Sequence, residues 1–245
     1  EMSFVDEEDI FTTMSGLTRH IFKTIRNVDL PDPFPRLTYM EAMDTYGSDK
    51  PDLRYEMTLK DVKEFSDASE FNAFKSAKTV KGLVVEEGAK YSRKIIDEFT
   101  DFVKKYEAKG LAWMKGENGV LTGGISKFFP EDLQKSMCKK LGIKDGDALL
   151  MVGDERMTVL SALGALRVEI ARRENLAEEG VFLPLWVTEF PMFEYDREAD
   201  RYFAMHHPFT APRKEDVEKL DGDPSIAFSR GYDLTMNGLE IAGGS

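Results

Sequence analysis

The sequence predicts an α+β protein in which helices pack against antiparallel sheets. Two observations support this fold class. Short β-rich runs alternate with helical segments through the middle of the chain, which is typical of a small α+β domain with its own core. In the last third, the dipeptide Asn237-Gly238 separates two strand-like runs and is a strong signal for a two-residue hairpin.

The composition indicates a protein with a packed core and no membrane-spanning segment. The chain has 245 residues, a net charge of −12 and 42% hydrophobic residues, which is enough for a packed core. No apolar run approaches the roughly 20 residues that span a bilayer, and no secretory signal is present at the start, so we expect no membrane partner. The single Cys138 rules out an internal disulfide and fits a reducing, cytoplasmic environment.

The first predicted element is an amphipathic helix. Acids at positions 6–9 suit a helix N-terminus, and the helix is expected to lie on a sheet. His20 has no ligand-type neighbour and is interpreted as a helix-surface residue. Three prolines at 31, 33 and 35 then force an extended run. The apolar positions of the helix recur every three or four residues at Ile10, Met14, Leu17, Ile21 and Ile25, and Phe11 and Phe22 widen this stripe.

A short helix and a polar loop follow. Thr38 and Glu41 form a capping box, and the helix is expected to stop at Gly47. The loop Gly47–Asp52 is rich in turn formers. Its charged residues and Arg54 could hold one another in salt bridges or meet a phosphate, and we favour the salt bridges. The sequence assigns the loop no catalytic role.

The middle of the chain contains the alternating strands and helices. None of its glycines forms a GxGxxG or GxxxxGK motif, so no phosphate cradle is predicted there. Residues 75–94 carry six basic and two acidic side chains, which would suit a local nucleic-acid contact but more simply describe a solvated helix face. The expected elements are a strand Val80–Val85, a helix capped by Ser92 and closed by Gly110, a strand Leu111–Lys115, a helix from Pro130 to Gly142, a strand Leu149–Val152 and a helix capped by Asp154.

Two of the three histidines are adjacent in the last third. They follow the apolar-rich run Phe182–Phe193 and a polar turn at 196–200, a pattern that predicts a long hairpin with the histidines on its return strand. Neighbours in a strand point to opposite faces, so His206 and His207 cannot both share a face with Tyr202. Pro208 is expected to end the strand.

Two acids flank the Asn237-Gly238 hairpin. On adjacent strands Asp233 and Glu240 would lie roughly level, where two carboxylates repel each other unless a proton or a metal lies between them. Oxygen-only ligation suits Mg²⁺, which keeps waters and binds substrate phosphates. The alternative is an exposed hairpin with two solvated acids.

Four segments carry a family resemblance: FPMFEYD, AMHHPFT, YDLTMNGLEIAGGS and YGSDKPDLRYEM. Together, with YGSDKPDLRYEM first along the chain and the other three following it, they resemble the bacterial-type aspartyl-tRNA synthetases, which are class II enzymes. The resemblance implies that His206, with His207, lies in the aspartate pocket, and that Asp233 and Glu240 lie at the ATP and Mg²⁺ site. Ala242 departs from the family's glycine, so the backbone there is expected to differ slightly.

The resemblance also implies a function and its partners. It implies an enzyme of protein biosynthesis that activates L-aspartate with ATP and transfers it to the 3′ end of tRNA(Asp), with tRNA(Asn) as a second candidate. A cytoplasmic homodimer is implied as well. His206 would hydrogen-bond the amino acid, and Asp233 with Glu240 would hold Mg²⁺ against ATP.

The resemblance divides the chain into three parts. Residues 1–66 and 180–245 would belong to an antiparallel-sheet catalytic domain, and residues 67–179 would be an inserted GAD domain. Glu1 would be the last acidic residue of the second class II motif. The rest of that motif, motifs 1 and 3 and the anticodon-binding domain would lie outside the chain, so we expect these 245 residues alone to be inactive.

Two alternatives to the ligase remain open. GAD domains also occur in tRNA-dependent amidotransferase subunits, so the chain could be a non-catalytic module that binds tRNA or a protein. The histidine and acid segments argue against this, because they have no place in those subunits. A degenerate, synthetase-like paralogue is the third possibility, and the intact residues His206, Asp233 and Glu240 count against it.

Overall fold

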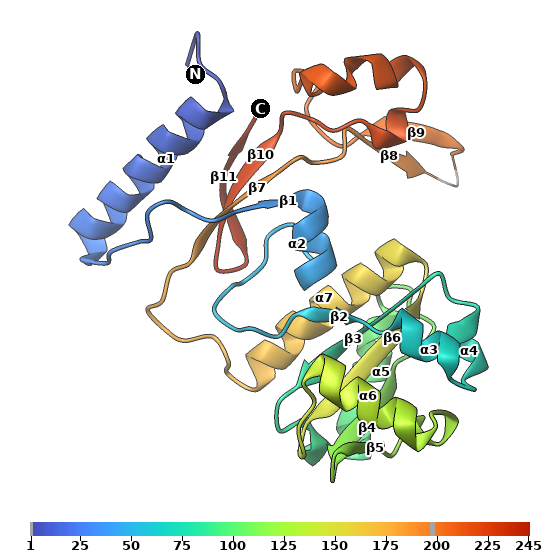
Figure 1. Cartoon of the computed structure of the whole chain (residues 1–245). Helices are drawn as coiled ribbons and strands as arrows, with labels where there is room; N and C mark the ends of the chain where they lie inside the picture. The colour runs from blue at the N-terminus through green and yellow to red at the C-terminus, as the bar shows by residue number, and fades with distance from the viewer. Residues whose placement is uncertain (1, 197–198) are drawn as a thin grey trace. The chain divides into compact units, whose positions relative to one another are not determined.

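The computed structural model describes residues 2–196 and 199–245. The polar turn at 197–198 and Glu1 lie outside the described residues. The chain divides into two compact units (Figure 1). Unit 1 comprises Glu1–Ala42, Asp49–Arg54 and Glu178–Ser245, and unit 2 comprises Met43–Ser48 and Tyr55–Ala177. The predicted α+β fold with antiparallel sheets is confirmed.

Unit 1 is built on a four-stranded sheet of order β1-β7-β10-β11. The outer pair β1–β7 is parallel, whereas β7–β10 and β10–β11 are antiparallel. The strands are β1 (Arg36–Thr38), β7 (Pro184–Thr188), β10 (Tyr232–Met236) and β11 (Leu239–Gly244).

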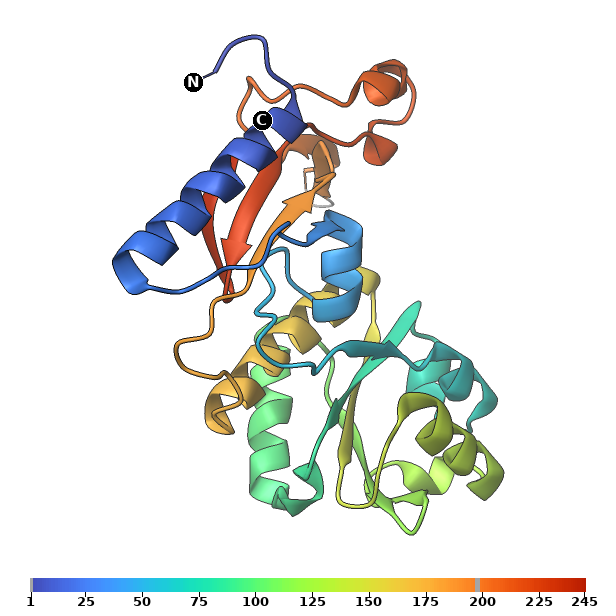
Figure 2. The same cartoon turned by 60° about the vertical axis from the view of Figure 1, so that its left-hand side comes forward.

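Helix α1 (Glu7–Ile21) lies along one face of this sheet (Figure 2). Asp6 caps the helix and forms a capping box with Asp9, as the acidic N-terminus predicted. The predicted apolar stripe is only partly correct: Phe11, Met14 and Phe22 pack on the core, whereas Leu17 and Ile21 are 47% and 42% exposed. The Phe11 ring contacts Trp186 at a tilt and Tyr232 edge-on.

Helix α2 (Tyr39–Tyr46) follows β1. The predicted capping box is confirmed: the Thr38 amide donates to a Glu41 carboxylate oxygen at 2.8 Å, and the Glu41 amide donates to Thr38 Oγ1 at 3.2 Å. The chain then turns at Gly47, which has φ +68°, into the loop that precedes β2.

The predicted hairpin is present but shorter than expected, and its return strand ends at Ala204, before His206, His207 and Pro208. Strand β7 ends at Thr188 because Glu189 takes a left-handed conformation with φ +57°. The hairpin that follows is a separate two-stranded sheet of β8 (Phe193–Asp196) and β9 (Arg201–Ala204). Two short 3₁₀ segments, Lys214–Asp221 and Pro224–Ile226, then return the chain to β10.

Unit 2 contains a five-stranded antiparallel sheet of order β2-β3-β6-β4-β5. The central strands β3 and β6 are almost continuously buried, because helices cover both faces of the sheet. Such strands read as unbroken apolar runs rather than as alternating ones. The strands are β2 (Leu59–Asp61), β3 (Thr79–Val85), β4 (Ala112–Glu117), β5 (Val120–Thr122) and β6 (Ala148–Asp154).

The helices of unit 2 complete its core. Ser92 caps α5 and Gly142 ends α6 in the left-handed conformation, as predicted. The predicted end of α5 at Gly110 is wrong, because the helix ends at Lys104. Asp154 was wrongly predicted as the cap of the last helix: it ends β6, and Glu155 is the N-cap. The helices are α3 (Lys63–Ala68), α4 (Asn72–Lys75), α5 (Arg93–Lys104), α6 (Glu131–Leu141) and α7 (Arg156–Arg173).

The predicted inserted domain, 67–179, falls in unit 2 except for its last two residues, and unit 2 extends further to include β2. The basic strip at 75–94 does not form one solvated helix face. Lys81 is buried beside Asp44, while Lys78 and Lys90 form ion pairs with Glu155 and Glu174. No helix among the described residues is both long and apolar enough to cross a membrane.

Candidate functional site

The hairpin predicted at Asn237-Gly238 is confirmed as the β10–β11 turn. Both turn residues have positive φ, +54° for Asn237 and +85° for Gly238, which the Asn-Gly pair tolerates well. The Asn237 side chain also accepts from the Leu183 amide at 3.0 Å and donates to the Val181 carbonyl at 2.8 Å. The turn is therefore held by its own conformation and by hydrogen bonds to the segment before β7.

The two acids of the hairpin lie on a diagonal. Glu240 pairs with Thr235, and Asp233 pairs with Gly243, because a bulge shifts the register between Leu234 and Thr235. The prediction that the two acids are level is wrong, because a two-residue turn at 237–238 already places Glu240 opposite Thr235, and the bulge moves the partner of Asp233 one residue further, to Gly243. The diagonal still brings the two carboxylates to the same side of the hairpin.

Gly243 marks the point where the two carboxylates meet. A Cβ built on this glycine would lie 2.6 Å from Asp233 Oδ1 and 3.0 Å from Glu240 Oε1. A side chain at 243 would therefore occupy the space between the acids. Ala242, where the family has glycine, is not among the residues with positive φ, and it packs against the unit 1 core. Alanine is therefore compatible with the observed backbone.

The surroundings of Asp233 disfavour its charged form. Burial, with smaller contributions from the carboxylates of Glu240 and Asp49, raises its pKa to about 6 against a lowering effect of Lys50. Residues 2–196 and 199–245 contain no group of three or more His, Cys, Asp or Glu residues able to hold a metal. Asp233 and Glu240 are thus a pair of neighbouring carboxylates rather than part of a larger cluster of such side chains within these residues.

The loop after α2 lies beside the hairpin turn. A Cβ built on Gly238 would be 3.5 Å from Asp52 Cβ and 4.0 Å from the Lys50 carbonyl oxygen. Asp52 is buried and pairs with Arg54 through two hydrogen bonds, 2.7 Å to Nη2 and 3.0 Å to Nε. Asp49 and Lys50 form a second, looser pair at 3.9 Å. The salt-bridge interpretation of this loop thus fits two separate pairs.

His206 and His207 follow β9 and have different surroundings. His206 is half-buried, with Nε2 at 3.1 Å from both the Pro191 carbonyl oxygen and Ser229 Oγ. Its Nδ1 has no hydrogen-bond partner among the described residues, and a Cβ built on Gly231 would lie 3.6 Å from it. His207 is exposed, and its Nδ1 accepts from the Phe209 amide at 3.2 Å.

The structure thus brings Asp233 and Glu240 together, and it places His206 beside Gly231, two residues before Asp233. It shows no direct contact between His206 and either acid within the described ranges. His207 points to a different environment. The convergence of all four residues on one substrate remains a prediction.

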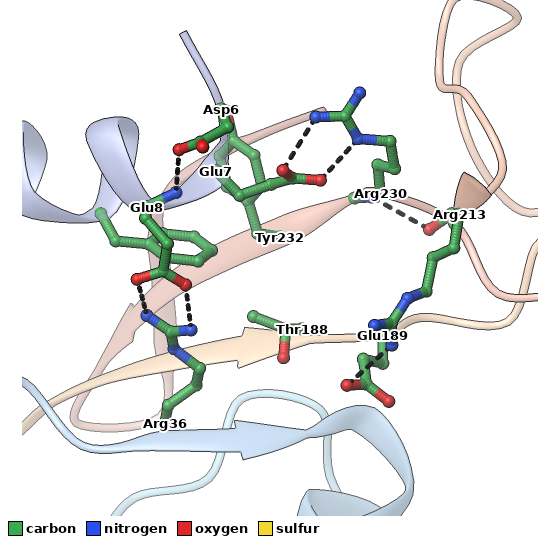
Figure 3. A pocket seen from close by; sticks show the side chains of 12 residues that line it. Asp6, Glu7, Glu8, Arg36, Thr188, Glu189, Arg213, Arg230 and Tyr232 are labelled. Atoms are coloured by element: carbon green, nitrogen blue, oxygen red, sulfur yellow. Dashed lines mark hydrogen bonds and ion pairs between the residues drawn. The ribbon is translucent and has the colours of Figure 1, made fainter. Parts of the chain in front are cut away.

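A charged pocket that the sequence did not predict lies at the N-terminus of α1 (Figure 3). Its volume is about 290 Å³. Glu7 pairs with Arg230 at 2.5 and 2.8 Å, and Glu8 pairs with Arg36 at 2.6 and 3.0 Å. Arg213 pairs with Glu189 at 2.8 Å. The lining residues are Asp6, Glu7, Glu8, Phe11, Arg36, Thr188, Glu189, Arg213, Ser229, Arg230, Gly231 and Tyr232.

Ion pairing dominates this pocket. The hydrogen bonds from Arg230 hold the pKa of Glu7 below its ordinary value, and those from Arg36 do the same for Glu8. Burial, with the Glu7 charge, raises the pKa of Tyr232. No local pattern could have revealed these pairs, because Glu7 and Arg230 are 223 positions apart. The four predicted site residues do not line this pocket.

Comparison with known proteins gives a consistent result. The whole chain, residues 1–245, matches the family model described as tRNA synthetases class II (D, K and N). It is 45% identical over 250 residues to an aspartate–tRNA ligase of Halalkalibacterium halodurans and 44% identical to one of Staphylococcus saprophyticus. It is 46% identical to an aspartate–tRNA(Asp/Asn) ligase of Bacillus cereus. Each match covers 100% of this chain and 42% of the relative.

Proposed function

This chain belongs to the class II tRNA synthetases (D, K and N), and we propose that it supplies part of an aspartate–tRNA ligase. The resemblance to bacterial-type aspartyl-tRNA synthetases, predicted from four segments, is confirmed by 44–46% identity along the whole chain. Because the chain spans 42% of the length of these relatives, the activity belongs to the proposal.

The proposed reaction has two steps. An oxygen of the aspartate α-carboxylate attacks the α-phosphorus of ATP, the bond to the β-phosphate bridging oxygen breaks, and pyrophosphate leaves. The terminal adenosine hydroxyl of tRNA then attacks the aspartyl carbonyl, and AMP leaves. The protein contributes mainly by positioning the reactants and by stabilising charge.

One observation supports this proposal best: the convergence of Asp233 and Glu240 over Gly243, with the pKa of Asp233 raised to about 6. Two carboxylates this close favour a cation between them. A pair, rather than a cage of three or more acidic ligands, suits Mg²⁺, which usually keeps waters and takes phosphate oxygens as ligands. Bound Mg²⁺ would neutralise charge on the ATP phosphates.

Each protein residue has a defined part in the proposal. Asp233 and Glu240 hold the cation, and Glu240, which is exposed, also faces the nucleotide. His206 orients the amino acid through Nδ1, since Nε2 is engaged by Ser229 and the Pro191 carbonyl. His207 is assigned to the outer part of the same pocket. The substrates are L-aspartate, ATP and tRNA(Asp).

The finer features of the proposal follow the family. The name of the Bacillus cereus relative includes both tRNA(Asp) and tRNA(Asn), so charging of tRNA(Asn) by this protein is a second candidate activity. We further propose a cytoplasmic homodimer and an inserted GAD domain at 67–179. Aminoacylation assays with each purified tRNA would separate the two substrate ranges.

The decisive experiment is aspartate-dependent exchange of labelled pyrophosphate into ATP by the full-length protein. Glu240→Gln should lower the exchange rate about a hundredfold or more, because it removes one of two proposed cation ligands. The matched control is Glu218→Gln, an exposed acid of the same unit outside the hairpin. Full activity of Glu240→Gln would remove this residue from the site, and an absence of exchange in the wild type would reject the ligase.

His206 is tested through the aspartate requirement. His206→Ala should raise KM for aspartate about tenfold and leave KM for ATP unchanged, because one hydrogen bond to the amino acid is lost. His20→Ala is the control, since His20 is an exposed residue of α1, as the sequence predicted. An unchanged aspartate KM in His206→Ala would exclude His206 from the pocket.

A further inference from the structure

The loop from Gly47 to Tyr55 begins against helix α7. Gly47 and Gly164 are in such close contact that no side chain fits at either position. A Cβ built on Gly164 would lie 2.1 Å from the Gly47 carbonyl oxygen, and one built on Gly47 would lie 2.6 Å from Gly164 Cα. Gly47 also has φ +68°, which favours glycine. The first end of the loop is therefore fixed by backbone contact with α7.

The second end of the loop is held by Arg167 of the same helix. Arg167 is 1% exposed and is among the largest fully buried side chains of the described residues. Its Nε donates to the Met57 carbonyl at 2.5 Å, and its Nη2 donates to the Tyr55 carbonyl at 2.9 Å. The guanidinium also lies 5.0 Å from the ring centroid of Tyr46 and 4.1 Å from that of Tyr55. Arg167 therefore contacts residues on both sides of the loop.

The two anchoring residues occupy one face of α7. Gly164 and Arg167 are three positions apart, so they lie on adjacent turns of the same face. A buried guanidinium is costly unless its donors are satisfied, and the planar fork of arginine suits two carbonyl acceptors in a way that lysine does not. An apolar side chain would be enough to fill this position in the core, so the hydrogen bonds of Arg167 indicate a more specific role.

The middle of the loop lies against the hairpin turn. Pro51 and Asp52 are buried, and the Asp52–Arg54 pair closes the loop on itself. Asp52 Cβ lies 3.5 Å from the position that a Cβ on Gly238 would take. Gly238 belongs to the turn that joins the strand of Asp233 to the strand of Glu240. The middle of the loop is thus packed against the turn that joins the strands of the two acids.

We propose that Arg167 is a positioning residue: with Gly164 it fixes both ends of the Gly47–Tyr55 loop, and the loop in turn supports the hairpin that carries Asp233 and Glu240. The part that concerns catalysis rests on the proposed function, whereas the part that concerns the loop does not. Arg167 touches neither acid, so its effect is transmitted through the loop alone.

Amide hydrogen exchange tests the positional part on the wild-type chain and on Arg167→Ala. Peptides covering residues 48–54 should exchange at least about tenfold faster in the variant, because two charge-assisted hydrogen bonds at the loop end are lost. Peptides from the central strands β3 and β6 should be unchanged. The control is Arg173→Ala, which removes another arginine of α7 whose partners are Glu98 and Glu169.

Two results would overturn the proposal. If loop and strand peptides accelerate together, Arg167 only stabilises unit 2, and if the loop is unchanged, Arg167 does not hold it. Should Arg167→Ala fail to fold, Arg167→Lys is used, because it keeps the charge but loses the fork. For Arg167→Lys, too, the proposal is overturned if loop and strand peptides accelerate together or if the loop is unchanged. Gly164→Ala provides an independent variant, since its Cβ must displace Gly47, and it should also accelerate exchange in the loop.

Pyrophosphate exchange by the full-length protein tests the catalytic part. Arg167→Ala should raise KM for magnesium-ATP about tenfold and leave KM for aspartate unchanged, since the loop supports the proposed cation ligands. A loss confined to kcat, with both KM values unchanged, would point to a smaller folded fraction and would reject the positioning role. If the wild type shows no exchange, the proposed function fails while the hydrogen-exchange result stands.

Discussion

The two units of this chain differ most in charge. Unit 2 contains 21 basic and 21 acidic residues, whereas unit 1 contains 12 basic and 24 acidic residues. The whole net charge of −12 therefore belongs to unit 1. Unit 1 also carries Asp233, whose pKa burial raises to about 6. An excess of acids that includes a half-buried one is unfavourable for stability, and it is expected where a protein binds cations.

The cores of the units differ as well. In unit 2, thirteen buried apolar residues form one cluster between the sheet and helices α3, α4 and α6. In unit 1, the cluster between α1 and the sheet contains six buried residues, and ion pairs line the pocket at the helix N-terminus. Because its apolar cluster is smaller, we expect an ion pair to contribute more to the stability of unit 1 than to that of unit 2.

The largest effect is expected from the core of unit 2. Leu149 of β6 is fully buried, so Leu149→Ala should lower the free energy of unfolding by about 2–5 kcal/mol through lost burial and a residual cavity. Trp113 reports on unit 2 and Trp186 on unit 1, and single-tryptophan backgrounds allow separate unfolding curves. We expect the Trp113 transition to shift and the Trp186 transition to stay.

Val168→Ala, on the exposed side of α7, is the control for this experiment and should have an effect below about 0.5 kcal/mol. Equal shifts of both tryptophan transitions in Leu149→Ala would show that the two units unfold together. The two cores would then not be independent units of stability.

A smaller change in the free energy of unfolding, this time an increase, is expected when Asp233 is replaced. A carboxyl whose pKa is raised in the folded state contributes stability below its unfolded pKa and loses it as the pH rises through about 6. Asp233→Asn should therefore stabilise unit 1 at pH 7.5 by about 1 kcal/mol, after allowance for screening by solvent. Thermal unfolding followed by Trp186 fluorescence measures the gain, which should vanish near pH 4.

Magnesium provides a second measurement of the same group. Mg²⁺ should raise the unfolding temperature of the wild type and not that of Asp233→Asn, because ligand binding stabilises the folded state by mass action. Glu218→Gln controls for the general loss of negative charge. If Glu218→Gln stabilised unit 1 as much as Asp233→Asn, the raised pKa of Asp233 would not explain the gain.

Local features of the fold could be predicted from the sequence. The capping box at Thr38, the Ser92 cap and the Asn237-Gly238 turn are correct because each depends on residues a few positions apart. The central strands of unit 2 could also be predicted, because a strand that is buried on both faces consists of consecutive apolar residues. The proximity of Asp233 to Glu240 followed from the turn.

Features that depend on distant partners could not be predicted. Spacing within α1 placed Phe11 on the apolar stripe but did not show its aromatic partners Trp186 and Tyr232, which centre the buried face on Phe11. The diagonal placement of the two acids follows from the two-residue turn, but the bulge that adds one residue to their offset has no sequence signal. Arg167 looked like an ordinary residue of a long helix, although its partners lie 110 and 112 positions away.

The smallest effects on the free energy of unfolding are expected from ion pairs. The less exposed pair of unit 1 should contribute more than the more exposed pair of unit 2. The side chains of Glu7 and Arg230 are each 33% exposed and share two hydrogen bonds, whereas those of Lys78 and Glu155 are 72% and 41% exposed. Double-mutant cycles with Gln and Met substitutions should give a coupling of about 0.5–1 kcal/mol for Glu7–Arg230 in unit 1. The coupling for Lys78–Glu155 in unit 2 should stay below about 0.3 kcal/mol.

The pH dependence of the first coupling provides its own check. Arg230 lowers the pKa of Glu7, so the stabilisation is present above the unfolded pKa of this acid and is lost as the pH falls through its depressed folded value. The Glu7–Arg230 coupling measured at pH 7 should therefore disappear in strong acid. Equal couplings for the two pairs would contradict the view that unit 1 depends more on its charged contacts than unit 2 does.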